Sequence, residues 1–418
     1  MQNSENEMPQ NGDVYIPDSS SNVAHKKQKN IKYAVLMIFT AVIFTAFGAA
    51  ITLMLLVFGD RADGSDALEI IAEAYETIES RFVGGYDADT IKDEAIEGLV
   101  EGLGDRWSRY MTADEVAEYE LDQQNVIVGI GVTVSKTEGS GMLVETVYAG
   151  GGAEAAGIQP GDVLIAADGV DLVPLTMDEG KLYVGGEEGT FVMLTVLHPD
   201  GTREELSVER KVVFIPPVSS RMIGNVGYIK LDNFDDGAAD AFEEALDALI
   251  EEGAAAFIFD VRNNGGGYVR EMTTILDTLL PEGEIFVHRD SEGHETVTTS
   301  DKAFLDYPMA VLVNSSSYSA AEYFAAVLQE YDAALIVGEK TVGKGYSQQT
   351  ISLSDGSALV LSTKIYCLPS RTSLAGVGIT PDIEISLNEE AAYYLYYGTL
   401  EDDADLQLQA ALENIFTE

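Results

Sequence analysis

The strongest constraint on the fold is a regular alternation of apolar runs and amphipathic segments between residues 212 and 388. Residues 255–261 and 309–313 are short, almost continuous apolar runs, as expected for buried strands. Residues 236–252 instead repeat apolar side chains at helical spacing, and residues 320–330 do the same directly after a strand. Strands that alternate with helices favour an α/β core, and we predict one over residues 212–388.

The N-terminal region contains an uncharged apolar stretch, residues 33–58, that is long enough to cross a bilayer. Four lysines precede it: Lys26, Lys27, Lys29 and Lys32. Because a lysine excess marks the cytoplasmic side, we expect a single-pass membrane anchor with the later domains outside the cell membrane. A cleaved signal peptide is the alternative. Residues 1–32 are polar and are predicted to form a disordered cytoplasmic tail.

The charge and the cysteine count exclude several classes of function. Acidic residues number 71 against 24 basic ones, and the net charge of −47 argues against nucleic acid as a partner. Cys367 is the single cysteine, so no disulfide can form within the chain. It lies in an apolar run and is interpreted as a buried structural thiol rather than a nucleophile. No cluster of His and Cys suggests zinc, and we predict no cofactor.

Short glycine-punctuated β runs occupy residues 125–211. A Gly-Ile-Gly start, the central segment 150–170 and the strand-like segment 189–196 together resemble a PDZ domain. Such domains add an extended peptide to a sheet edge and capture its terminal carboxylate with backbone N–H groups. The resemblance implies a carboxylate-binding loop formed by Val128, Gly129, Ile130 and Gly131, whereas the pattern alone would also fit a glycine-kinked strand.

A serine-rich turn lies between the apolar run 309–313 and the helical segment 320–330. Ser319 stands at the end of this turn, where the free N–H groups of a helix start could stabilise an oxyanion. The same residues also fit a capping box, with Ser319 as N-cap and Glu322 three positions later. These two interpretations do not exclude one another.

Lys344 lies between two glycines just after a predicted strand. A lone lysine is usually a solvated surface charge, and a Gly-Lys-Gly loop could also hold phosphate. The P-loop spacing is absent, however, because a glycine follows the lysine.

The chain resembles the carboxy-terminal processing proteases, the tail-specific or S41-type serine peptidases. Four segments carry the resemblance in order: 259–267, 314–322, 343–348, and 366–371 with 376–385. The resemblance implies a multidomain α/β protein with a ClpP/crotonase-like protease core at 212–388. Helical segments at 59–124 and 389–418 would flank the PDZ-like and protease parts, and they make a homodimer plausible.

The resemblance also implies the residues of a Ser-Lys dyad. Ser319 would be the nucleophile, Lys344 the general base, and Gln348 the residue that positions the lysine side chain. The oxyanion donors would be the backbone N–H groups of Ala320 and Gly266. A lysine can act as a base when burial lowers its pKa towards about 7–8. The expected substrates are proteins or peptides with free apolar C-termini.

Two rival interpretations stay open. A Ser-His-Asp triad would use His288 or His294, although both are expected in exposed loops. A catalytically inactive, membrane-tethered PDZ adaptor on a protease fold is the other rival.

Three positions depart from the family pattern. Tyr318 replaces a small residue before the nucleophile, Gly265 replaces a common proline, and Gly185 replaces an arginine linked to PDZ–protease coupling. We expect Tyr318 to narrow the site and Gly265 to loosen the oxyanion loop.

Overall fold

The computed structural model describes residues 62–136 and 139–417. The predicted tail and transmembrane helix, residues 1–58, lie outside the described residues. Among the residues that are described, no helix is long and apolar enough to span a membrane. The chain divides into two compact units, Met1–Ala88 and Asp89–Glu418, and the elements that build the candidate site belong to the second.

The predicted helical segment 59–124 contains three described helices and a short strand. The strand was not predicted; it comes shortly after a turn at residues 106–107. The elements are α2 (Ala62–Arg81), α3 (Ala88–Glu101), β1 (Arg109–Met111) and α4 (Ala113–Asp122). Helix α4 begins with a capping box between Thr112 and Glu115, which satisfies the free N–H groups of its first turn.

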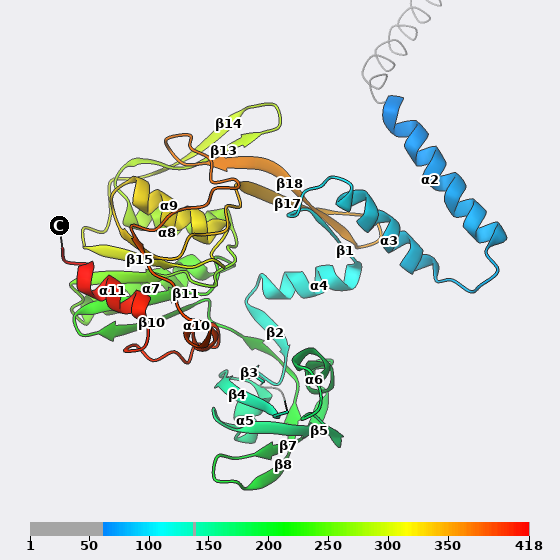
Figure 1. The fold of residues 1–418 in the computed structure, drawn as a ribbon, viewed down its shortest axis with the longest axis horizontal. Coiled ribbons are helices and arrows are strands. Elements are labelled where there is room, and N and C mark those ends of the chain that lie inside the picture. Colours follow the sequence, from blue (N-terminus) through cyan, green and yellow to red (C-terminus); the bar gives the residue numbers. More distant parts are fainter. Residues whose placement is uncertain (1–61, 137–138, 418) are drawn as a thin grey trace, which may run out of the picture. The chain divides into compact units, whose positions relative to one another are not determined.

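A six-stranded sheet forms the centre of the predicted α/β core (Figure 1). Its order is β10-β11-β12-β15-β16-β19, and all neighbours except β10 and β11 are parallel. The strands span, in that order, Val218–Ile223, Val226–Leu231, Ala256–Asp260, Met309–Val313, Leu335–Gly338 and Ile383–Glu384. Parallel strands linked through helices confirm the α/β architecture that was predicted from the alternating pattern.

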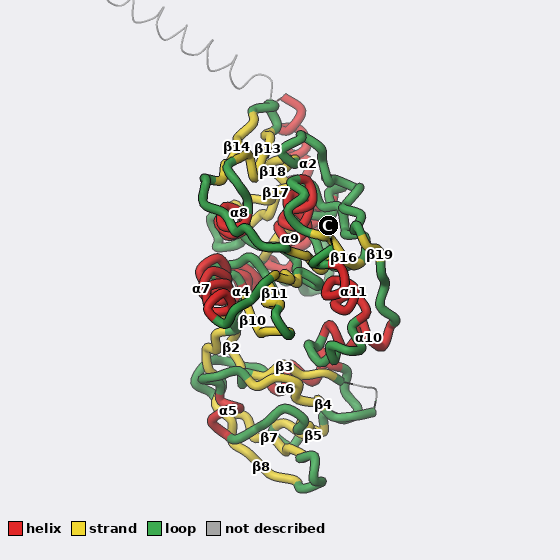
Figure 2. The backbone as a smooth tube through the Cα atoms, turned by 90° about the vertical axis from the view of Figure 1, so that its left-hand side faces the viewer, coloured by secondary structure: helices red, strands yellow, loops and turns green. Residues whose placement is uncertain are grey.

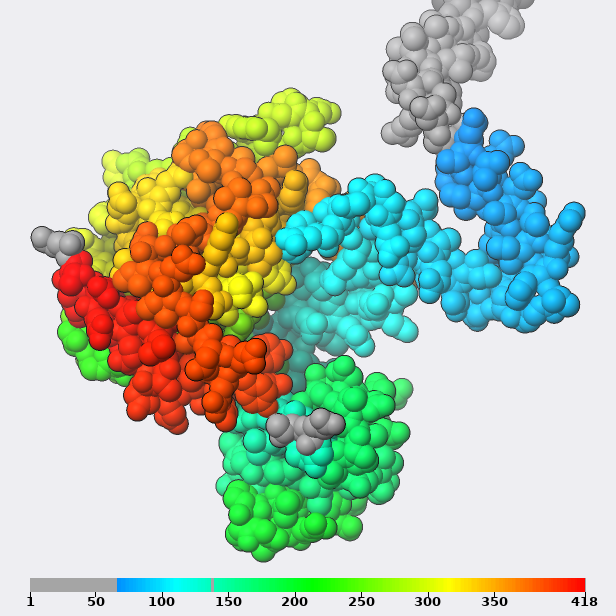
Figure 3. Space-filling view, viewed as in Figure 1, coloured from blue at the N-terminus to red at the C-terminus, as the bar shows by residue number. Residues whose placement is uncertain are grey.

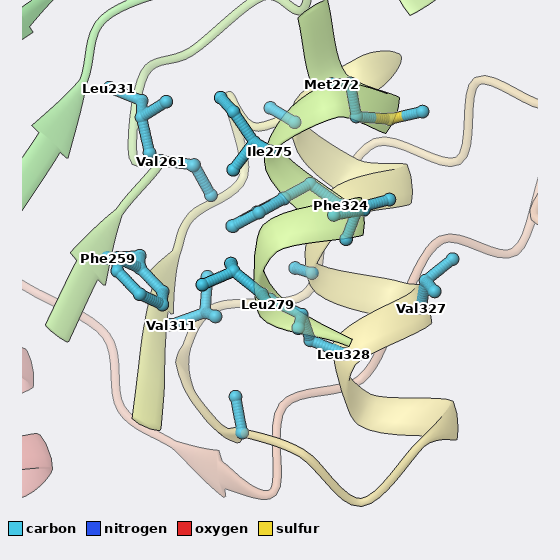
Figure 4. Close-up of a cluster of buried hydrophobic side chains, with 14 of the residues drawn as sticks. Leu231, Phe259, Val261, Met272, Ile275, Leu279, Val311, Phe324, Val327 and Leu328 are labelled. Atoms are coloured by element: carbon cyan, nitrogen blue, oxygen red, sulfur yellow. The ribbon is translucent and has the colours of Figure 1, made fainter. Parts of the chain in front are cut away.

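Side chains along these strands alternate between two apolar cores. Phe257 and Phe259 of β12 point into the larger core, whereas Ala256 and Ile258 point into the smaller one. Figure 4 shows the larger core, and Figure 2 shows that helices cover both faces of the sheet. The larger core packs against α7 (Ala238–Glu251), α8 (Val269–Leu279) and α9 (Ala320–Glu330), the smaller against α11 (Leu406–Asn414). Because both faces are covered, the central strands β12 and β15 are buried along their whole length.

A second, antiparallel sheet brings distant parts of the chain together. Its order is β1-β18-β13-β14, and β17 pairs with the same strand β18. Strand β1 lies beside β18, with Arg109 opposite Val360, although about 250 residues separate them in sequence. The strands span Gly283–Asp290 (β13), Glu295–Ser300 (β14), Tyr346–Ser352 (β17) and Ala358–Cys367 (β18). The segment before the PDZ-like module, which was predicted as a helical packing or dimerisation unit, therefore contributes a strand to this sheet.

The PDZ-like module has its own sheet and core. The sheet order is β3-β4-β5-β7-β8, with β6 paired to β5, and Val144, Leu164 and Val192 are among its fully buried residues. Arg210 is also buried and donates hydrogen bonds to the Tyr183 and Val184 carbonyls at the end of α6. The elements are β3 (Val132–Ser135), β4 (Met142–Val147), α5 (Gly152–Ala156), β5 (Val163–Ala167), β6 (Val170–Asp171), α6 (Met177–Val184), β7 (Phe191–Leu197) and β8 (Arg203–Glu209). An antiparallel pair, β2 (Val126–Gly129) with β9 (Lys211–Phe214), connects the module to the core at both ends.

The C-terminal segment is helical, as predicted. It contains α10 (Glu389–Tyr396) and α11, and α11 packs on β15 and β16. In the space-filling view these residues, coloured orange-red and red, lie on the surface of the protease core (Figure 3). Tyr393, Tyr394 and Tyr396 of α10 are exposed.

Candidate active site

A single cavity of about 1060 Å³ contains all five residues that were predicted to carry the chemistry. Ser319, Lys344, Gln348, Ala320 and Gly266 all line it. They come from three separate segments of the sequence, which the parallel sheet and the antiparallel sheet bring to one place. The tertiary structure thus assembles the predicted set, and the contacts between its members decide what each can do.

Ser319 lies on a sharp turn between β15 and α9. Its backbone has φ 59° and ψ −126°, a conformation that residues other than glycine rarely adopt. Two hydrogen bonds fix this turn to the segment that follows β12. Ser317 Oγ donates to the Val261 carbonyl at 2.7 Å, and Tyr318 N–H donates to the Asn264 carbonyl at 3.2 Å. A serine on a strained strand-to-helix turn has its hydroxyl exposed, which suits a nucleophile.

The loop 264–267 packs directly against Ser319. A Cβ added to Gly266 would lie 2.7 Å from Ser319 Cβ and 2.9 Å from the Ala320 nitrogen, so only glycine fits there. The Gly266 N–H donates to Asn264 Oδ1 at 2.8 Å, within its own loop. Among the described residues, no group accepts a hydrogen bond from the Ala320 N–H, which leaves this donor free at the helix start.

The capping-box interpretation of this helix start was wrong. The Ser319 side chain makes no cap hydrogen bond, and the Glu322 carboxylate points elsewhere. Glu322 is fully buried and accepts hydrogen bonds from Thr341 Oγ1, from Gly343 N–H at 2.6 Å and from Lys344 N–H at 2.9 Å. Burial raises the pKa of Glu322, and these three donors partly offset the increase. Glu322 therefore fixes the loop that carries Lys344, a role that the sequence analysis missed.

Replacing Glu322 with glutamine is expected to lower kcat by about 10- to 100-fold with little change in KM, because the lysine loop would lose its anchor. The glutamine NH₂ group would face two backbone N–H donors, so the loop must shift. Steady-state kinetics on a peptide substrate checks this. Glu330→Gln, at the exposed end of the same helix, is the control and should retain full activity. Equal kcat values for the two variants would contradict the positioning role.

Lys344 is partly buried above two aromatic rings. Its Nζ lies 5.0 Å from the centre of the Trp107 ring and 5.7 Å from that of the Tyr318 ring. The pKa of Lys344 is lowered to about 8, mainly by burial and in part by the positive charge of Arg109, whereas Asp105 opposes the shift. Within the described part of the chain, no hydrogen bond joins Nζ to Ser319 Oγ.

Comparison with known proteins decides the family. The model of peptidase family S41 matches residues 225–385, a PDZ domain model matches 143–197, and a model named "Activating protease CtpB N-terminal domain" matches 58–115. A carboxyl-terminal-processing protease of Synechocystis is 33% identical over 330 residues, which cover 76% of this chain and 75% of that protein. The chain belongs to the S41 peptidase family. It is a serine peptidase with a PDZ domain, which confirms the resemblance found in the sequence.

Two further matches agree with this assignment. A protein of Staphylococcus haemolyticus named "Probable CtpA-like serine protease" is 29% identical over 381 residues, covering 88% of this chain and 76% of that one. A solved S41-type structure from Bacteroides fragilis has a TM-score of 0.56 at 19% identity and covers 80% of this chain and 92% of that one. This structural likeness shows that the fold is shared.

Gln348 shares the cavity of this S41 peptidase but does not contact the lysine amine. Its Nε2 donates to the Tyr346 carbonyl at 3.2 Å and to Ser362 Oγ at 3.1 Å. Gln348 nevertheless lies on β17, four residues after Lys344, and lines the same cavity. Its role in orienting the lysine stays a prediction.

Two departures from the S41 pattern turn out to be one structural change. A Cβ added to Gly265 would lie 2.7 Å from the Tyr318 hydroxyl, so the tyrosine occupies the space that a proline would need. Tyr318 and Gly265 therefore fit together, and both line the cavity. The large side chain of Tyr318, just before Ser319, is accommodated because Gly265 in the neighbouring loop has no side chain.

Two hydroxyl groups in the cavity lack partners. Across the described residues, only Ser347 Oγ and Tyr366 Oη are buried side-chain polar atoms without a hydrogen bond, and both residues line this cavity. Because buried polar atoms are normally paired, these two are available to a bound group.

The histidine rival to the lysine finds no support in the geometry. Neither His288 nor His294 lines the cavity. His288 Nε2 lies 3.4 Å from Lys364 Nζ, and His294 Nδ1 lies 3.2 Å from Asp290. Cys367 is buried and free, as expected for a structural thiol.

The predicted carboxylate-binding residues lie in the PDZ domain, away from the cavity lining. Val128 and Gly129 belong to β2, where they pair with Val212 and Lys211 of β9. Ile130 and Gly131 follow in the turn before β3, and Gly131 has φ +81°. Backbone conformations of this kind suit a close approach to a ligand.

Proposed function

We propose that this S41 peptidase is a membrane-anchored endopeptidase that captures C-terminal tails of proteins and cleaves them with a Ser319–Lys344 dyad. One observation carries the proposal: Ser319, on a strained turn, shares a cavity with the partly buried Lys344, whose pKa is lowered to about 8. A serine attacks an amide only when a base takes its proton. Lys344 is a titratable group of suitable pKa in this cavity.

The reaction follows from these groups. The neutral amine of Lys344 takes the proton of Ser319 as Oγ attacks the peptide carbonyl. The free Ala320 N–H at the start of α9 stabilises the oxyanion, and the partial positive charge of the helix start adds to it. The ammonium then gives its proton to the leaving amine, and water releases the acyl group by the same route. Gly266 serves as a second donor once its N–H leaves Asn264.

The PDZ domain supports recognition of a free tail. Strand β3 stands at the edge of its sheet, so an extended peptide can add beside it. The Ile130–Gly131 turn immediately precedes that strand and is the candidate site for the terminal carboxylate. Substrates with apolar free C-termini fit this arrangement.

The proposed anchor is the uncharged stretch at residues 33–58, with the lysine-rich side in the cytoplasm and the catalytic domain outside. A homodimer formed through the helical segments is part of the same proposal.

The test is cleavage of a protein that ends in an apolar tail, compared with the same protein carrying an amidated C-terminus. Mass spectrometry of the products should show cleavage of the free-tail form at least about tenfold faster, because amidation removes the charge that the PDZ turn binds. Equal rates would contradict tail recognition. Tail binding without cleavage would instead indicate the inactive adaptor.

A further inference from the structure

The turn between α3 and β1 contributes an aromatic residue directly to the candidate active site. Trp107 is the only tryptophan of the chain, and its ring stacks on that of Tyr318 with centroids 5.9 Å apart and an interplanar angle of 26°. Lys344 Nζ lies over both rings, 5.0 Å and 5.7 Å from their centres. Tyr318 immediately precedes the nucleophile. These contacts form a two-ring seat for the lysine amine.

The seat is held in place by the same turn. Asp105 accepts hydrogen bonds from Trp107 N–H at 3.1 Å and from Ser108 Oγ. Ser108 Oγ in turn accepts from the Ser362 N–H of β18 at 3.1 Å. Because β1 continues the ladder along β18, the indole is fixed relative to the strand pair that follows Lys344.

Aromatic faces attract an ammonium group but not a neutral amine. A general base, however, must be neutral before it can accept a proton from Ser319. The seat therefore favours the form of Lys344 that cannot react, and it keeps the amine without a hydrogen bond to the nucleophile among the described contacts.

We propose that Trp107 is a positioning residue of this peptidase: with Tyr318 it holds the ammonium form of Lys344 in the resting enzyme. The amine becomes available to Ser319 when it loses its proton or when a ligand in the cavity displaces the indole. Trp107 is half-buried and lines the cavity, so a peptide that fills the cavity contacts the ring. This inference rests on the proposed role of Lys344 as base.

Charged and titratable groups from several elements surround the Lys344 amine and influence its protonation together with the two rings. The guanidinium of Arg106 lies 4.3 Å from the Trp107 ring centre and is a second cation at this ring. The carboxylate of Glu322 accepts a hydrogen bond from the Lys344 backbone N–H and does not pair with Nζ. The other groups of this environment are Asp105, Arg109, Tyr318 and Tyr366.

The first test uses Trp107 as its own reporter, since an ammonium on the indole changes its fluorescence and a neutral amine does not. Tryptophan emission of the full-length protein, followed from pH 6 to 10, should show a transition with a midpoint near the Lys344 pKa of about 8. Lys344→Met should abolish the transition, whereas Lys364→Met, a lysine on the neighbouring strand outside the cavity, should retain it. No transition, or one that persists in Lys344→Met, would overturn the proposal.

The second test measures the acid limb of the kcat/KM profile on a peptide substrate. Trp107→Leu removes the aromatic face, and the limb should move to lower pH by about half a unit to one unit, which raises activity near pH 7 by roughly three- to tenfold. Trp107→Phe keeps a weaker face and should shift the limb less. If the acid limb stays in place or moves to higher pH in Trp107→Leu, the proposal that Trp107 stabilises the ammonium form of Lys344 is wrong.

The outcomes separate this inference from the proposed function. A fluorescence transition in a protein whose Lys344→Met variant still cleaves would support the contact and refute the lysine as base. An inactive Lys344→Met variant without any transition in the wild type would support the base and refute the seat.

Discussion

Replacing Ser319 with alanine, or Lys344 with methionine, is expected to reduce cleavage of a tailed substrate by at least about a thousandfold, because the members of a catalytic dyad act as a unit. The double variant should be no slower than either single one. Both side chains line the same cavity, and removal of either leaves only binding and the oxyanion donors.

The two variants should differ in stability, which separates catalysis from folding. Burial lowers the folded pKa of Lys344 from 10.5 to about 8. The unfolded chain therefore binds more protons than the folded one between pH 8 and 10.5, and the lysine contributes instability that is fully present below pH 8 and fades as the pH rises towards 10.5. At pH 7, Lys344→Met should stabilise the fold by on the order of 2 kcal/mol. Ser319→Ala keeps the strained backbone and should change stability little.

Cleavage rates are measured by mass spectrometry, and the stability of both variants is measured by thermal unfolding at pH 7 and pH 10. In the wild type, kcat/KM should rise as the pH increases through about 8, since the reactive amine is the neutral one. A fully active Lys344→Met variant would exclude the dyad. A Lys344→Met variant that is inactive because it is unfolded would be recognised by its lower melting temperature.

Ser319 and Lys344 could be proposed from the sequence, and the structure places both in one cavity, because each leaves a local signal. Ser319 follows an apolar strand and precedes a helix, and Lys344 stands between glycines after another strand. Trp107 has no such signal, since its contact with Lys344 depends on the pairing of β1 with a strand about 250 residues away. A single sequence does not reveal which distant strands pair.

Glu322 shows a different limit of prediction. Its spacing from Ser319 fits a capping box, and local propensity alone would satisfy the helix start in that way. The fold instead buries the carboxylate and turns it towards the loop 341–344, where three donors converge. A tertiary contact replaced the local one, because a buried carboxylate needs several donors. The Ala320 N–H, which a capping box would not use, makes no hydrogen bond among the described residues and is the donor proposed to serve the oxyanion.

Replacing Arg262 with methionine is expected to destabilise the protein by about 3–5 kcal/mol, because it leaves buried carboxylates without their counter-charge. Arg262 is 2% exposed. Its guanidinium pairs with Asp260 at 2.6 Å and with Asp405 at 2.7 Å, and it donates to Gln407 at 3.0 Å. Although burial raises the pKa of Asp260, the Arg262 charge outweighs it and holds this pKa below its usual range. The pair therefore stabilises the fold above the usual carboxyl pKa, and this contribution is lost as the pH falls through the lowered value.

A matched control is Arg221 on β10, which pairs with the same C-terminal segment. Arg221 also joins the central sheet to this segment, through an ion pair with Asp402, but both side chains are about 40% exposed. Arg221→Met should cost no more than about 1 kcal/mol, because water screens an exposed pair. Thermal and urea unfolding of both variants checks the difference. Equal losses would show that burial does not set the strength of the Arg262 network.

The Arg262 variant should also lose activity at temperatures where it remains folded. Arg262 N–H donates to Asp260 Oδ1 at 2.9 Å, at the point where β12 ends and the glycine loop against Ser319 begins. Loosening this strand end would move Gly266. This glycine packs so closely against the helix start that a Cβ added to it would lie 2.9 Å from the Ala320 nitrogen. A shift of about 1 Å at an oxyanion site can cost on the order of a hundredfold in rate. Stability and kcat should therefore fall together in Arg262→Met, whereas Arg221→Met should leave both near their wild-type values.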